Sequence, residues 1–152
     1  MLKIIMLIAF LGANFSNFRL GFSNKIRIKI RPIYLIIIGA YSLLILIMAG
    51  KKDGSIMGYI LAISTILLLL SNILSRGVRE DGIVLMNGAN PLLILIKKRY
   101  IKYVSFDEKK AEIKLRIKAK GSYYVESFGK KDRNKLEGFI ADFKFPKNKL
   151  SE

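Results

Sequence analysis

The chain contains no cysteine, no histidine and no tryptophan among its 152 residues. Without cysteine it has no disulfide, no thiolate nucleophile and no thiolate metal site. Without histidine it lacks the commonest metal ligand and the usual proton carrier at neutral pH. These absences narrow the available chemistry, and we expect neither a cofactor nor a bound metal ion.

Charged residues are also absent from two long stretches, Pro32 to Gly50 and Gly54 to Ser75. As helices these stretches would reach about 28 to 33 Å at ~1.5 Å per residue, enough to cross the ~30 Å hydrocarbon layer of a bilayer. A buried helical hairpin of a soluble domain would usually show a polar stripe at helical spacing, and none is present here. The two stretches therefore predict a transmembrane hairpin with helices at about 33–49 and 55–74.

The first uncharged segment, residues 4–18, has three interpretations: a cleaved signal peptide, a first transmembrane helix, or a helix lying in the membrane interface. Cleavage would leave the basic residues of 19–31 outside the cell, and two further crossings would export the basic C-terminal region as well. The charge distribution therefore favours an uncleaved helix at about 4–18. We expect a membrane region over residues 1–75 with two or three crossings.

Basic residues are unevenly distributed between the segments that flank these helices. Residues 19–31 contain five basic side chains and no acidic one, and residues 76–152 carry a net charge of +9. The turn between the hairpin helices holds only Lys51, Lys52 and Asp53. By the positive-inside rule, this asymmetry predicts a multi-pass protein of the cell membrane with a cytoplasmic C-terminal domain.

The predicted helices contain no ionisable residue of the kind that forms a proton relay or an ion site. Gly54, Gly58 and Ala62 follow one another at intervals of four, which makes one face of the third helix small. Such a face allows close helix packing, here against the region of Gly39 and Ala40 or against a second copy of the chain.

Basic and apolar residues alternate strictly from Lys25 to Arg31. A period of two gives an extended segment one basic face and one apolar face. Three interpretations remain open: a strip that lies on anionic lipid, a topology signal alone, or an edge strand that pairs with the C-terminal domain.

From residue 76 onward the leucine runs give way to short alternating segments separated by turn residues. The clearest is 111–118, in which apolar and charged side chains alternate. Leu136, Phe139, Ile140 and Phe143 have helical spacing after a capping Asp132, and Pro146 would end that helix. We predict an α+β domain over residues 76–146, with a tail at 147–152. The expected strands of its antiparallel sheet are 82–86, 92–97, 100–106, 111–118 and 123–128.

The order of these features resembles a known family. A transmembrane hairpin is followed by RGVREDGI at 76–83, then by short strands that include YYVESF at 123–128, and then by a final helix around 136–143. This order is similar to small bacterial membrane proteins of unknown function that carry a pleckstrin-homology-like domain, and the resemblance covers about residues 33–144. It implies a strongly bent sheet or an open barrel that is closed by the C-terminal helix and used for binding or assembly, without known catalysis.

The sequence offers little support for an enzyme. The carboxylate pairs Glu80 with Asp81 and Asp107 with Glu108 lie in predicted turns beside basic residues, whereas a catalytic acid needs a pKa shifted by burial or by a like charge. No glycine-rich phosphate loop is present. We expect no catalytic residue and no small-molecule substrate.

The remaining candidates are basic side chains that could contact anionic lipid: Arg27, Lys29, Arg31, Arg76, Lys97, Lys98, Arg99 and Lys102. Tyr100 and Tyr103 lie among the last four, a pairing that nucleic-acid binding would also use. For a domain tethered at Arg76, the membrane is the nearer polyanion, and a merely solvated basic face is the remaining interpretation.

We therefore expect the tethered domain to act as a binding or assembly module for a protein partner or for anionic headgroups. The alternative is an accessory subunit of a membrane transporter or another membrane complex, in which the helices make the important contacts.

Overall fold

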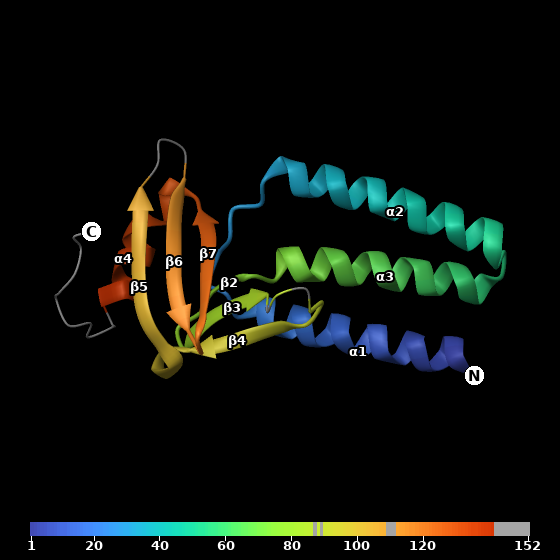
Figure 1. Ribbon diagram of the computed structural model, residues 1–152, viewed down its shortest axis with the longest axis horizontal. Coiled ribbons are helices and arrows are strands. Elements are labelled where there is room, and N and C mark those ends of the chain that lie inside the picture. Colours follow the sequence, from blue (N-terminus) through green and yellow to red (C-terminus); the bar gives the residue numbers. More distant parts are fainter. Residues whose placement is uncertain (87, 89, 109–111, 142–152) are drawn as a thin grey trace.

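The computed structural model describes residues 1–86, 88, 90–108 and 112–141. Three helices, α1 (Leu2–Phe22), α2 (Pro32–Lys52) and α3 (Ile56–Leu74), run side by side, and a small antiparallel-sheet domain lies at one end of them (Figure 1). All three helices are long and apolar enough to cross a membrane. The predicted hairpin is therefore confirmed, with ends within a few residues of those expected.

Helix α1 extends four residues beyond its predicted end at residue 18. Asn14 and Asn17 do not interrupt the helix, because both side chains are buried against the neighbouring helix. Asn14 Nδ2 donates to the carbonyl oxygen of Ser64 in α3 at 3.1 Å. An interhelical bond of this kind typically contributes about 0.6 to 2 kcal/mol in a membrane.

The two ends of the helical layer are chemically different. At one end, Lys3 Nζ lies 2.7 Å from a carboxylate oxygen of Asp53, so the N-terminus and the α2–α3 turn lie together. At the other end, the segment between α1 and α2 joins the sheet domain (Figure 1). The two basic segments, 23–31 and the domain, therefore share one end, as the charge asymmetry requires.

Helix α3 lies between α1 and α2, and two residues of the small face that the sequence indicated, Gly58 and Ala62, are buried. Gly54 is in the turn with φ +59°, and a Cβ on Gly58 would collide with the Asp53 carboxylate. Ala62 is buried. A Cβ on Gly39 would meet nothing within 4 Å, so the predicted contact with the Gly39 and Ala40 region is wrong.

Other residues also contribute to the packing of the helices. The partly buried side chains of α2 recur at helical spacing, at Ile38, Ser42, Ile45 and Ala49. The ends of α1 and α3 come very close together at Gly21. A Cβ atom added to Gly21 would overlap Ser75, the C-cap residue of α3. A glycine is therefore required at the position where α1 and α3 converge.

The sheet domain consists of two antiparallel sheets and a short C-terminal helix. The four-stranded sheet has the order β1-β2-β3-β4, and the three-stranded sheet has the order β5-β6-β7. The strands are β1 (Ile26–Arg27), β2 (Gly77–Val78), β3 (Gly82–Met86), β4 (Leu93–Lys97), β5 (Ile101–Glu108), β6 (Ile113–Ala119) and β7 (Ser122–Phe128). Helix α4 (Arg133–Ala141) follows a short 3-10 turn, Lys130–Asp132.

The five predicted strands are present with shifted ends. Tyr100 belongs to a 3-10 turn, Lys98–Tyr100, and not to the strand after it. Strand β5 continues through Asp107 and Glu108, which were expected in a turn, because both residues pair with β6. Phe143, Pro146 and the predicted tail at 147–152 lie outside the described residues.

The alternating segment 25–31 supplies an edge strand, one of its three interpretations. Ile26 pairs with Val78 and Arg27 with Gly77. The segment then reaches the second sheet, since the Lys29 N–H donates to the Ser127 carbonyl oxygen at 2.7 Å. The α2–α3 hairpin is therefore inserted between two neighbouring strands, and the domain includes residues 23–31 as well as those after residue 76.

The core lies between the two sheets and α4. Strand β6 shows why: its alternate residues Ile113, Leu115 and Ile117 are fully buried, while the side chains between them are polar. Leu136 and Phe139 of α4 close the core on one side. Ile26 and Ile28 enter the same core from the segment before the hairpin.

Asparagine side chains attach the β3–β4 hairpin to the helices. The carbonyl oxygen of Pro91 accepts hydrogen bonds from Asn17 Nδ2 at 3.0 Å and from Asn72 Nδ2 at 2.9 Å. Asn17 Oδ1 in turn accepts from the backbone N–H of Leu93 at 2.9 Å. We call Asn17, Asn72 and Pro91 the asparagine clasp. It holds the tip of the hairpin beside α1 and α3.

Because β1 pairs with β2, we expect the stability of the sheet domain to depend on residues that precede the helical hairpin. Ile26→Ala would remove a side chain that is 3% exposed, and we expect a loss of about 2 to 5 kcal/mol in unfolding free energy. Arg27→Ala, at the exposed next position, should change stability little. Chemical denaturation of the full-length protein in detergent would measure both, and equal effects of the two variants would contradict the prediction.

Candidate anion-binding site at the junction of helices and sheet

A cavity of about 260 Å³ lies where the start of α2 and the end of α3 meet the three-stranded sheet. Its volume is several times the ~30 Å³ that one water molecule occupies. Four basic side chains and one acidic side chain line it: Lys29, Arg31, Arg76, Lys114 and Glu126. We call this the junction cavity.

Lys29 and Arg31 reach the junction cavity because the segment that carries them is extended. The backbone bond from Lys29 to Ser127 fixes this segment along β7. Arg31 is the N-cap residue of α2, and its Nη2 lies 2.9 Å from Glu112 Oε1 and 3.4 Å from Ser127 Oγ. Arg31 is therefore held at the point where the chain enters α2.

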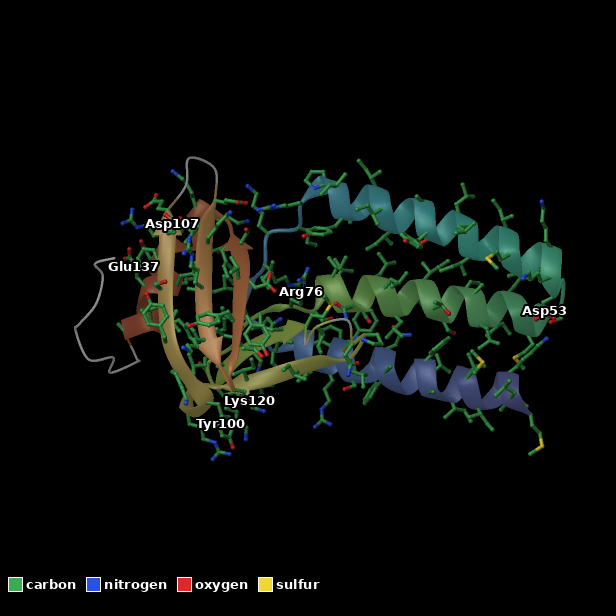
Figure 2. The ribbon with its side chains drawn as sticks, in the orientation of Figure 1. Asp53, Arg76, Tyr100, Asp107, Lys120 and Glu137 are labelled. Atoms are coloured by element: carbon green, nitrogen blue, oxygen red, sulfur yellow. The ribbon has the colours of Figure 1, made fainter. Side chains whose placement is uncertain are left out.

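Arg76 occupies the corresponding point where the chain leaves α3 (Figure 2). Its side chain is only 14% exposed, and its Nη1 lies 3.3 Å from Glu126 Oε1. The buried Nε has no hydrogen-bond partner among the described residues. Since a guanidinium carries five N–H donors, Arg76 retains donor capacity beyond its bond to Glu126.

Glu126 is the acidic residue of the junction cavity. It lies opposite Leu115 in the β6–β7 pairing and thus on the core-facing side of the sheet. Burial raises the pKa of its carboxyl above the usual range, and the Arg76 guanidinium opposes this shift. Separating a buried ion pair leaves an uncompensated buried charge, so Glu126 holds the Arg76 guanidinium in place.

The charge balance of the junction cavity favours an anion. Lys29, Arg31, Arg76 and Lys114 line it, while two carboxylates offset part of their charge: Glu126 in the lining and Glu112, which is bound to Arg31. The positive end of the α2 dipole also lies there, because α2 begins at Pro32. Phosphate is the anion that arginine and lysine side chains in such an arrangement bind best.

The other predicted basic residues are not part of this cavity. Arg27 is exposed on β1, and Lys97 is exposed at the end of β4. Lys98 lies 5.1 Å from the centroid of the Phe139 ring, and Arg99 lies 4.8 Å from that of the Tyr100 ring. Lys102 is exposed at the start of β5. Figure 2 shows this corner of the domain, marked by Tyr100 and Lys120, away from Arg76.

Six of the nine lining residues were not site candidates from the sequence: Ile28, Tyr34, Lys114, Val125, Glu126 and Ser127. Lys114 was expected only on the polar face of its strand, and Glu126 only as part of the YYVESF segment. Their convergence depends on how the sheet packs against the ends of the helices, which no local pattern encodes.

The two carboxylate pairs of the sequence have separate partners. Lys25 forms an ion pair with Glu80 and lowers the pKa of that carboxyl, and Arg79 binds Asp81. Glu108 lies 3.1 Å from Arg133 of α4. Within the described residues, no group of three or more acidic side chains could hold a metal ion.

Burial and the charge of Arg76 shift the pKa of Glu126 in opposite directions, and the effect of Arg76 can be measured. Arg76→Gln removes the charge that opposes the effect of burial, so we expect the pKa of Glu126 to rise further. Arg79→Gln, which removes a guanidinium bound to Asp81, should leave it unchanged. Carbon-detected NMR titration of glutamate carboxyl groups in the full-length protein would measure both pKa values, and a fall in the Arg76→Gln variant would contradict the assignment.

No protein-family model, curated protein or solved structure matches this chain.

Proposed function

We propose that this is an integral membrane protein whose tethered sheet domain binds the phosphate of an anionic lipid headgroup in the junction cavity. The observation that carries the proposal is the convergence of Arg31 and Arg76, the residues at the entry to α2 and the exit from α3, on one cavity with Lys29 and Lys114. Binding there would fix the domain to the membrane surface and prepare it to assemble with a protein partner.

The location of the junction cavity favours a lipid headgroup over a dissolved anion as its ligand. The junction cavity lies at the ends of two helices that are long and apolar enough to cross a membrane, which is where headgroups are found. Tyr34 lines the cavity, and tyrosine rings settle at this level of a bilayer. Each basic residue near an anionic surface contributes about 1 kcal/mol to binding.

We also infer that the domain is pleckstrin-homology-like. Four antiparallel strands, three further antiparallel strands and a C-terminal helix follow one another in the expected order. Here the first strand comes from before the helical hairpin, which is a departure from a domain encoded by one continuous segment.

Removing charge from the junction cavity tests the headgroup site. We choose Arg31→Gln with Lys114→Gln, because Arg76 then stays paired with Glu126. At about 1 kcal/mol for each cation, the affinity for phosphatidylglycerol should fall roughly 30-fold. Native mass spectrometry of the full-length protein in a neutral detergent, with added lipid, measures this affinity.

The matched control is Arg99→Gln with Lys102→Gln, which removes the same charge from the other corner of the domain. We expect it to retain most of the affinity. Equal losses in the two double variants would show general surface attraction and would overturn the proposed site.

We propose further that the domain faces the cytoplasm of a bacterial cell. Because the chain has no cysteine, single introduced cysteines report topology without background. Lys120→Cys in the domain should react with a membrane-impermeant maleimide only after the cells are opened, and Lys52→Cys in the α2–α3 turn should react in intact cells. The reverse pattern would contradict this orientation.

A further inference from the structure

A second cavity, of about 310 Å³, lies directly beside the junction cavity. It is bounded by α2, α3 and the tip of the β3–β4 hairpin. Apolar side chains form most of its wall: Ile38 from α2, Leu69 and Ile73 from α3, and Met86 and Pro91 from the hairpin. We call it the apolar groove.

The two cavities share two residues, Tyr34 and Arg76, which line both. The junction cavity and the apolar groove are thus adjacent, with Tyr34 and Arg76 bordering both. A phospholipid matches this pair of cavities, because its charged phosphate is linked within a few bonds to apolar acyl chains.

The apolar groove lies beside the domain end of α2, not beside the end near the α2–α3 turn. Near the turn, α2 and α3 approach closely, because a Cβ on Gly50 would lie 2.9 Å from the Tyr59 hydroxyl oxygen. At the domain end, the hairpin tip held by the asparagine clasp contributes Pro91 to the groove wall. Tyr34 and Met86, which line the groove, are themselves exposed, so the groove is open to its surroundings.

From this arrangement we propose that each chain binds one phospholipid molecule, with its phosphate in the junction cavity and one acyl chain in the apolar groove. This inference rests on the proposed headgroup site, and it adds the lipid chain as a second recognised element. An anionic headgroup without an acyl chain would fill only half of the site.

A groove-filling substitution tests this arrangement. Leu69→Phe places a larger side chain in the groove wall, and Leu67→Phe makes the same change at a position that is 41% exposed. For the full-length protein in neutral detergent, we expect Leu69→Phe to weaken dioleoyl phosphatidylglycerol binding roughly tenfold, equivalent to about 1.4 kcal/mol. Leu67→Phe should keep the wild-type affinity.

Soluble glycerol phosphate separates this inference from the proposed function. Its weaker binding should be the same in Leu69→Phe and in wild type, and should decrease in the Arg31→Gln, Lys114→Gln double variant. If Leu69→Phe leaves phosphatidylglycerol binding unchanged while the double variant loses it, the acyl-chain site is wrong and the headgroup site stands. If neither variant has an effect, both proposals fail.

A second measurement uses the wild-type protein, so that it does not depend on the folding of a variant. Phosphatidylglycerol with a nitroxide on one acyl chain should broaden the methyl NMR signals of Ile38 and Ile73 well before those of Leu35 and Leu67. Uniform broadening of all four signals would show lipid surrounding the helices without a bound chain, and would overturn the inference.

Discussion

The pairing of β1 with β2 is the constraint on which the rest of the structure depends. It joins a segment before the helical hairpin to one after it, so both ends of the hairpin must lie at the same sheet. Arg31 and Arg76 stand at these two ends, separated by 44 positions in sequence but brought to one cavity. The same pairing buries Ile26 and Ile28 in the core, so the sheet domain and the helices form one folding unit.

Much of this architecture follows from sequence patterns. The uncharged stretches predicted α2 and α3, and the strict alternation in β6 predicted its buried face. Long periodic segments are reliable because many residues give the same signal. The alternation from Lys25 to Arg31 was ambiguous, because an extended segment with a basic face suits lipid and a strand edge equally well.

The features that the sequence did not reveal depend on tertiary contacts. The helix expected at 4–18 includes Asn14 and Asn17, but no sequence pattern indicated that their amides bond to α3 and to the hairpin. Of the eight basic residues proposed to contact lipid, Lys29, Arg31 and Arg76 share a cavity, because they flank the hairpin. Lys114 was missed, since its place depends on the packing of β6 against the helix ends. Strand β2 has only two residues, too few for a periodic signal.

The asparagine clasp determines how the domain can move. A domain tethered by a single flexible linker would rotate freely about its attachment point. Here the chain crosses between helices and sheet three times, at residues 23–25, at Arg31 and at Arg76, and Pro91 is bonded to both α1 and α3 as a further attachment. These four attachments restrict rotation of the sheet domain against the helices. A change in the inclination of the helices, such as a thinner bilayer imposes, would therefore be transmitted to the sheet as a rotation relative to the membrane plane.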